Sequence, residues 1–158
     1  MSEALSPAAQ RVQELLRSAG SEAQVKQLPV TARTAVDAAA AIGCTVAQIA
    51  KSLVFKSRSG RPVLVIASGV NRVDEGKIAA ALGEPIGKAD ATFVRDATGY
   101  AIGGVAPIGH ATPPRIFIDQ DLRQHAILWA AAGHPHAVFP STPAELERLT
   151  RGAVIEVK

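Results

Sequence analysis

Cysteine is almost absent from the sequence: Cys44 is the only one among 158 residues. A single cysteine excludes an internal disulfide framework and a cysteine-based zinc cluster. Long hydrophobic runs are absent too. No 18-residue window is apolar and free of charge, so no membrane span is expected. The first residues lack the basic and apolar regions of a signal peptide, and a soluble, cytoplasmic protein is therefore expected.

Aromatic side chains are scarce, at 4% of the residues. A surface that stacks successive bases on aromatic rings is therefore not expected. Charge is not strongly biased, because 17 Lys and Arg stand against 14 Asp and Glu, for a formal net charge of +3. This balance permits a polyanionic partner without requiring one. The length fits a single domain over residues 1–158, stable as a monomer.

Apolar periodicity, capping residues and the placement of Gly and Pro predict the elements of the fold. Helices are expected over residues 6–19, 34–42, 74–82, 90–98 and 143–149. Strands are expected over residues 23–28, 51–56, 62–67, 115–118, 127–131 and 153–157, with the second and third joined as a hairpin. Because helices and strands mix irregularly instead of alternating, the pattern predicts an α+β fold with a mixed sheet.

Lys51 stands where a helical turn over residues 45–50 passes into an apolar strand. A lysine at the start of a strand is most often solvated. It can instead point into a cavity beside Leu53 and Phe55, where it would grip a phosphate or a carbonyl. The residues alone leave both interpretations open.

Residues 99–114 contain four Gly and three Pro and cannot be regular structure throughout. Gly103 and Gly104 allow close approach of the backbone, and Pro107 stiffens the turn. Such a loop can direct N–H groups at an anion or a developing oxyanion. It matches neither a dinucleotide fingerprint nor a P-loop. A purely structural connector is the alternative.

Metal-dependent and covalent catalysis find little support. His134 and His136 could form a metal-binding pair, but two ligands are too few for a catalytic metal. Asp119 and Asp121 are expected as capping residues, although a catalytic carboxylate pair stays open. There is no Gly-x-Ser-x-Gly motif, and Cys44 has no His near it in the sequence. We expect neither a metal nor a cofactor.

Basic residues gather between Asp37 and Asp74, a stretch that contains no acidic residue. The hypothesis is contact with the phosphate backbone of a nucleic acid, and a solvated face is the alternative. The candidates for this contact are Lys56, Arg58, Arg61 and Arg72.

Four segments together resemble the YbaK/ProX family, the free-standing relatives of the editing domain inserted in bacterial prolyl-tRNA synthetases. They are Thr34-Ala35, residues 48–55 (QIAKSLVF), residues 71–74 (NRVD) and residues 98–109 (TGYAIGGVAPIG). Each segment is short, and their order and spacing carry the resemblance. It runs from about residue 25 to the C-terminus.

The resemblance implies one α+β domain with a mixed, barrel-like sheet and surrounding helices, which hydrolyses the ester bond of mischarged aminoacyl-tRNA. Lys51 stands where the family has an essential lysine. Gly103 and Pro107 match the ends of a G-x-x-x-P loop that lies against the aminoacyl group and the terminal adenosine. Residues 131–133 resemble a small-residue segment beside the pocket, whereas residues 133–136 depart from the Gly-Gly-Lys-Arg segment of some members.

The resulting hypothesis is a trans-acting aminoacyl-tRNA deacylase that acts on tRNA of the proline type. A positioned water is the nucleophile, and the ribose hydroxyl of the substrate helps to activate it. Lys51 holds the terminal phosphate or the carbonyl, while N–H groups near Gly103 and Gly104 polarise the ester. The expected catalytic set is Lys51, Gly103, Gly104 and Pro107. The expected substrate-binding set is Thr34, Ser52, Ile102, Val105, Ala106, Gly133 and His134.

Two alternatives remain from the sequence. A non-catalytic module that binds tRNA or a nucleotide would use the same pocket and would not need Lys51 for turnover. A general nucleic-acid binder would bind unrelated DNA with a steep dependence on salt. The expected partner is aminoacyl-tRNA, and an aminoacyl-tRNA synthetase is a second candidate partner.

Overall fold

The structure is a computed structural model that describes residues 5–29 and 34–158. The α-helices are α1 (Pro7–Ser18), α2 (Ala35–Ile42), α3 (Glu75–Leu82), α4 (Ala91–Thr98) and α5 (Pro143–Thr150). Short 3-10 helices are η1 (Val46–Gln48) and η2 (Gln120–Gln124). The strands are β1 (Lys26–Gln27), β2 (Ile49–Ser57), β3 (Pro62–Ser68), β4 (Ile86–Lys88), β5 (Arg115–Asp119), β6 (Leu128–Ala131), β7 (Ala137–Ser141) and β8 (Ala153–Ile155).

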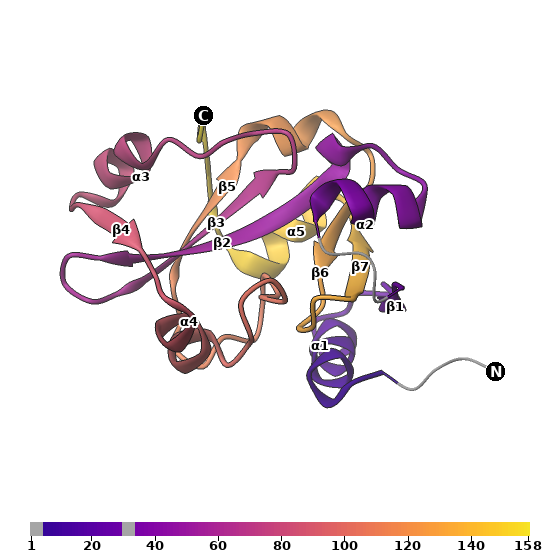
Figure 1. Cartoon of the computed structure of the whole chain (residues 1–158). Coiled ribbons are helices and arrows are strands. Elements are labelled where there is room, and N and C mark those ends of the chain that lie inside the picture. The colour runs from indigo at the N-terminus through magenta and orange to yellow at the C-terminus, as the bar shows by residue number, and fades with distance from the viewer. Residues whose placement is uncertain (1–4, 30–33) are drawn as a thin grey trace.

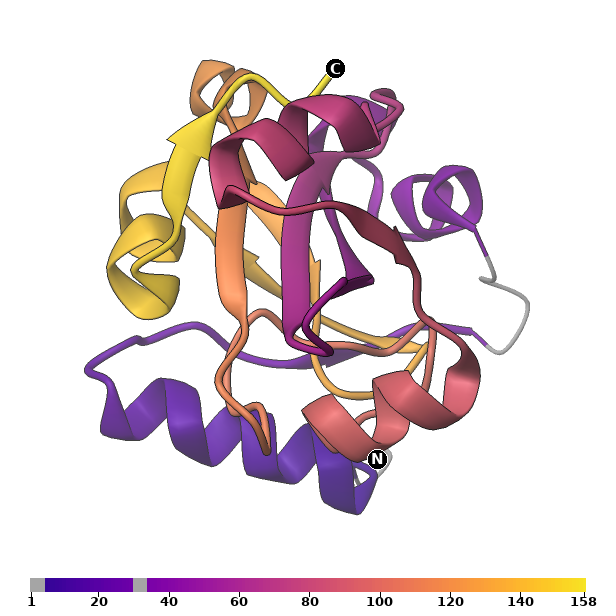
Figure 2. The same cartoon turned by 90° about the vertical axis from the view of Figure 1, so that its left-hand side faces the viewer.

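The eight strands of the described residues form one sheet in the order β1-β7-β6-β2-β3-β5-β8, with β4 added to β2. The long hairpin of β2 and β3 lies in its middle (Figure 1). Strand β2 is parallel to β6, and β3 and β8 are each parallel to β5, whereas the other neighbours are antiparallel. The helices lie around this sheet, with α1 along one end and α3 at the other (Figure 2). The predicted α+β domain with a mixed sheet and surrounding helices is confirmed.

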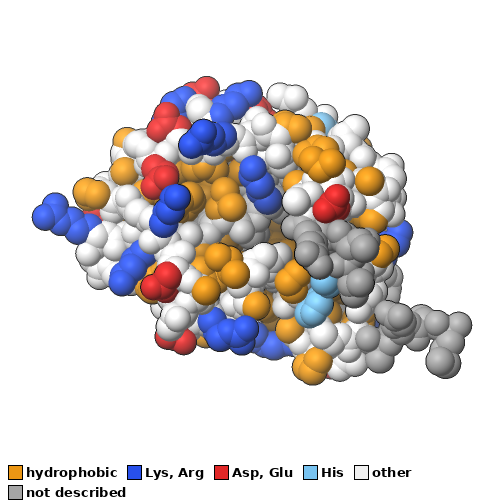
Figure 3. All heavy atoms as spheres, in the orientation of Figure 1, with side chains coloured by type: hydrophobic (Ala, Val, Ile, Leu, Met, Phe, Trp, Pro, Cys, Tyr) orange, Lys and Arg blue, Asp and Glu red, His pale blue; other side chains and the backbone are white. Residues whose placement is uncertain are grey.

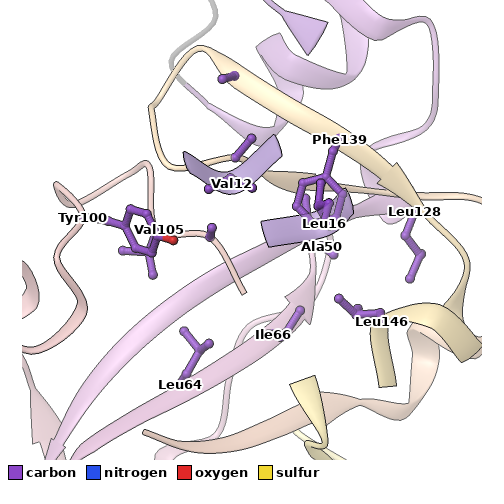
Figure 4. Packing of buried hydrophobic residues seen from close by; sticks show 14 of the residues in the cluster. Val12, Leu16, Ala50, Leu64, Ile66, Tyr100, Val105, Leu128, Phe139 and Leu146 are labelled. Atoms are coloured by element: carbon purple, nitrogen blue, oxygen red, sulfur yellow. The ribbon is translucent and has the colours of Figure 1, made fainter. Parts of the chain in front are cut away.

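Strand β3 is the centre of the core, because all seven of its residues are buried. Its near-continuous apolar sequence is typical of a strand covered on both faces. Leu64 and Ile66 pack on one side against α1 and the loop after α4 (Figure 4), whereas Val63 and Val65 pack on the other side against Phe117. The hairpin that positions the site is therefore held from both faces.

Two predicted strands are shorter than expected by two residues or more. The strand expected over residues 23–28 reduces to β1, because the Gln13 side chain takes up the backbone groups of the preceding residues. Its amide donates to the Ala23 carbonyl at 2.9 Å and accepts from the Val25 N–H at 2.8 Å. The strand expected over residues 153–157 ends at Ile155.

Strands β4 and β7 were not predicted from the sequence. Strand β4 has three residues with a glycine at its centre, and Pro140 lies inside β7; both residues are uncommon in strands. In the register of the sheet, Pro140 faces Trp129 of β6. Among residues 5–29 and 34–158, no helix is both long and apolar enough to cross a membrane.

Candidate active site

A break in strand pairing opens a pocket beside β2. One edge of β2 pairs with β3 throughout residues 50–56. The other edge pairs with β6 only at Ile49 and Ala50, and with β4 only at Phe55–Ser57. No strand among the described residues pairs with that edge between residues 51 and 54. A cavity of about 450 Å³ lies there, with every residue of 49–55 in its wall.

The register shows which backbone groups face this cavity. Gly69 N–H donates to the Ile49 carbonyl at 2.8 Å, and Ser57 N–H donates to the Arg61 carbonyl at 2.9 Å. Both bonds lie on the β3 side, and successive residues of a strand direct their N–H and C=O to alternate edges. The backbone groups of Ser52 and Val54 therefore face the cavity.

Lys51 lies in the wall of the cavity and is half-buried. Burial lowers the pKa of its ammonium below the ordinary value of 10.5, and the charge of Asp119 acts in the opposite direction. The Asp119 side chain is buried at the end of β5, beside β3, where its Oδ2 accepts from the Ser68 N–H at 3.0 Å. Of the two interpretations left open by the sequence, the structure supports a lysine that faces a cavity.

The Gly-rich loop, residues 99–114, forms the wall opposite Lys51. Ile102, Gly103 and Val105 line the cavity, and Ile102 is 60% exposed at its mouth. Gly103 has φ +87°, a backbone conformation that glycine adopts without strain. The Gly104 N–H donates to the Ala101 carbonyl at 3.0 Å and closes a turn. The Gly104 N–H is therefore hydrogen-bonded within the loop, whereas the sequence predicted that it would polarise the ester.

The loop is tied at its base to the N-terminal helix. The Tyr100 hydroxyl donates to the Ile108 carbonyl at 2.7 Å, and His110 Nε2 lies 2.7 Å from the Ala106 carbonyl. A Cβ at Gly109 would lie 2.5 Å from Leu15 Cδ1 of α1 and 2.7 Å from the Tyr100 hydroxyl, so the Leu15 side chain packs directly on the backbone of this glycine. These contacts fix the loop against the core, and the buried residues Ala106 and Pro107 lie outside the cavity lining.

The segment between β6 and β7 closes one end of the cavity. Ala131 and Pro135 line it, whereas Gly133 and His134 do not. Gly133 is buried with φ +88° and packs against the backbone of Ala8 in α1. His134 Nδ1 accepts from the His136 N–H at 3.1 Å and holds the turn. Gly133 and His134, which were both predicted to bind substrate, therefore lie behind the residues that line the cavity.

The structure gathers six residues of the predicted site around one cavity: Thr34, Lys51, Ser52, Ile102, Gly103 and Val105. Sequence reasoning missed other residues of the wall, among them Lys88, Val94, Trp129, Pro135 and Val138. Lys88 brings a second cation to the cavity from β4. In the space-filling view, hydrophobic side chains gather in the middle of this face, with Lys and Arg side chains beside them (Figure 3).

The predicted nucleic-acid contacts do not form one patch. Lys56, Arg58 and Arg61 lie at the tip of the β2–β3 hairpin, and the Lys56 ammonium sits 5.1 Å from the centre of the Phe93 ring. Arg72 follows the far end of β3, about 20 Å along that strand. The acid-free stretch of sequence is spread out because the hairpin is extended. Among the described residues, no group of three or more His, Cys, Asp or Glu is arranged to hold a metal ion.

Comparison with known proteins bears on this geometry. A family model for the aminoacyl-tRNA editing domain matches residues 30–149. The chain belongs to this family. The match includes β2, the Gly-rich loop and the β6–β7 segment, which all contribute to the wall of the cavity, and it leaves out α1.

Individual relatives of this editing domain are also similar to the chain. The chain is 30% identical over 129 residues to the uncharacterized protein YwhH of Bacillus subtilis (strain 168), with 82% of each chain covered. A solved structure of a candidate trans-editing enzyme for prolyl tRNA synthetase is 46% identical and superimposes with a TM-score of 0.94, covering 98% of this chain and 99% of the other. The hypothetical protein APE2540 is 26% identical, with a TM-score of 0.86 over 93% and 98% of the two chains.

Proposed function

We propose that this editing domain is a trans-acting aminoacyl-tRNA deacylase, which hydrolyses the ester between a wrong amino acid and tRNA of the proline type. The observation that carries the proposal is the cavity beside residues 51–54 of β2, where no described strand pairs with that edge, with Lys51 on one wall and the Gly-rich loop on the other. The similarity to a candidate trans-editing enzyme for prolyl tRNA synthetase supports the choice of tRNA.

The proposed reaction is attack by water on the ester carbonyl, followed by departure of the ribose oxygen. The ribose hydroxyl of the substrate takes part in activating that water, and the departing oxygen leaves protonated. Preorganised donors at the carbonyl oxygen lower the barrier, because negative charge develops there in the transition state. The walls of the cavity hold the ester and the water together, which contributes through orientation.

Lys51 has two proposed tasks. Its ammonium anchors the phosphate of the terminal nucleotide or contacts the ester carbonyl, and both tasks require the charged form. Lys88, in the wall of the same cavity where β4 pairs with β2, supplies a second cation for the phosphate. Ile102 is exposed at the mouth, where it offers an apolar surface to the terminal adenosine.

The proposal is tested by incubating the protein with tRNA charged with alanine, serine, threonine or cysteine, and following the loss of the ester. We expect accelerated deacylation of at least one of these and its loss in Lys51→Ala. The matched control is Lys26→Ala on the exposed strand β1. Decay at the spontaneous rate on every substrate would refute catalysis. Saturable binding without loss of the ester would instead identify a non-catalytic binding module.

A further inference from the structure

We infer that the edge of β2 over residues 51–54, with which no described strand pairs, recognises the backbone atoms of the aminoacyl group, with Ser52 as its hydrogen-bonding residue. The ester carbonyl accepts a hydrogen bond from the Ser52 N–H, and the α-ammonium donates one to the Ser52 carbonyl. This inference rests on the proposed function and names how the site holds its substrate. The substrate occupies the place of a missing strand residue.

The first argument is the direction of the backbone groups. Lys51 and Leu53 direct their N–H and C=O toward β3, as the bonds at Ile49 and Ser57 on the same strand establish. Ser52 directs both groups into the cavity. A residue that faces such a position in an antiparallel pair exchanges two hydrogen bonds with it, one from each N–H to the opposite C=O. An aminoacyl group carries the matching donor and acceptor on neighbouring carbons.

The second argument is the length of the gap. Residues 51–54 span about 13 Å of strand. β6 occupies the edge before them and β4 occupies the edge after them. A peptide strand longer than about four residues would collide with these neighbours, whereas an aminoacyl group fits between them. The edge is therefore suited to a short ligand such as an amino acid ester and not to a full additional strand.

The third argument is unsatisfied hydrogen bonding. Most of the named wall residues are apolar, and a backbone N–H or C=O without a partner is costly in such surroundings. The buried Ser52 hydroxyl also has no hydrogen-bond partner among the described residues 5–29 and 34–158. Binding of a ligand with complementary groups would remove this cost.

Charge decides between Ser52 and Val54, whose backbone faces the cavity from the other end of the gap. Along the strand, the Ser52 N–H comes directly after Lys51, and the Ser52 carbonyl lies farther from it. Placing the ester carbonyl on the N–H brings it toward the Lys51 cation and keeps the α-ammonium away from that cation. Lys51 and the Ser52 N–H would then both stabilise negative charge on the same oxygen.

The test uses two amide-linked analogues of the aminoacylated terminal adenosine that are not esters. One is 3′-alanylamido-3′-deoxyadenosine, and the other is the propionyl compound, which lacks only the α-amino group. Binding to ¹⁵N-labelled protein is followed by amide chemical shifts and hydrogen exchange. We expect saturating alanyl analogue to slow exchange of the Ser52 N–H at least about 10-fold, and the propionyl analogue to bind about 10- to 100-fold more weakly.

Leu53 is the internal control, because its N–H already faces β3 and should show little change. A response at Val54 in place of Ser52, equal affinity for the two analogues, or no binding of either would overturn the inference. Deacylation of mischarged tRNA is measured separately. Deacylation without a response at Ser52 would leave the proposed function standing, whereas a response at Ser52 without deacylation would leave only the binding mode.

A chemical variant tests the same N–H during turnover. Replacing the Ser52 peptide N–H by an ester oxygen removes the donor and preserves the side chain. The same replacement at Val54 is the matched control. In both variants the carbonyl of the preceding residue, which faces β3, becomes an ester carbonyl, so the strand pairing with β3 is weakened in the same way. We expect the Ser52 variant to lose at least about 10-fold in kcat relative to the Val54 variant. Equal rates in the two variants would contradict the inference.

Discussion

The Asn71 side chain donates a hydrogen bond from Nδ2 to the buried Asp119 carboxylate, at 2.8 Å from Oδ2. The same amide nitrogen lies 2.8 Å from Asp121 Oδ2, and the other oxygen of Asp119 accepts from the Asp121 N–H at 2.9 Å. Asn71 thus joins the end of β3 to the end of β5. Its place in the short segment over residues 71–74 is explained by this buried link.

Asn71→Ala should destabilise the fold by about 1–3 kcal/mol, because it leaves a buried carboxylate without one of its donors. The free energy of unfolding from urea denaturation, followed by circular dichroism, measures the loss. Arg72→Ala is the control. The Arg72 side chain is next in sequence and exposed, so its removal should change the free energy of unfolding by less than about 0.5 kcal/mol. Equal stability of the two variants would disprove the structural role of Asn71.

Lys51→Met should abolish the proposed deacylation without destabilising the fold at neutral pH. Burial lowers the pKa of Lys51 below 10.5, so the charged form is disfavoured in the folded state. Between the folded and unfolded pKa values the unfolded state binds more protons, and stability therefore rises as the pH rises toward 10.5. This rise should be smaller in Lys51→Met than in wild type when urea midpoints are compared at pH 7 and pH 10. A Lys51→Met protein that unfolds more readily at pH 7 would contradict the prediction.

His110 should make the protein less stable in mild acid. Burial lowers its pKa below the ordinary 6.5, the bond to the Ala106 carbonyl raises it, and the charge of Arg11 lowers it further. Between the folded pKa and 6.5 the unfolded state binds more protons, so this contribution to stability is lost as the pH falls below about 6.5. We expect the loss between pH 7.5 and pH 5 in urea titrations to be smaller in His110→Gln. A wild-type protein and variant with parallel profiles would rule the effect out.

The hairpin tip should contribute to binding of aminoacyl-tRNA and Arg72 should not. Each phosphate contact that is lost lowers the slope of log affinity against log salt by about 0.7–0.9. We predict a slope smaller by about 1.4–1.8 in the double variant Arg58→Gln and Arg61→Gln. Arg72→Gln, from the far end of β3, should keep the wild-type slope. Filter binding over a range of salt concentrations distinguishes the variants, and identical slopes in all three proteins would exclude the tip.

Local signals were enough to predict most of the fold. Ser6, Thr34, Asp74 and Asp90 accept hydrogen bonds from the first turns of their helices, and Gly residues end three of these helices in the left-handed conformation. The hairpin was predicted from its sequence just as directly, because the apolar residues of its two strands mark the paired and largely buried segments. These features depend on a few neighbours in sequence.

The remaining features depend on distant pairing. Lys88 enters the cavity through β4, a strand too short to recognise until its pairing with Phe55 is known. The exposure of the Ser52 backbone results from β6 and β4 both leaving the edge of β2, which no local pattern records. Gly133 was predicted beside the pocket from its small-residue segment, and it packs against α1 instead. The position of a residue in the sequence does not show whether it lines the cavity or packs behind the residues that do.

The helix α1 gives this protein a folding unit larger than its family signature. Val12 and Leu16 are completely buried, although the family match begins only at residue 30. A fragment trimmed to the matched region would uncover the apolar floor under both the Gly-rich loop and the β6–β7 turn. Grafting this domain onto another protein, or swapping it between relatives, therefore requires residues 5–29 to travel with it.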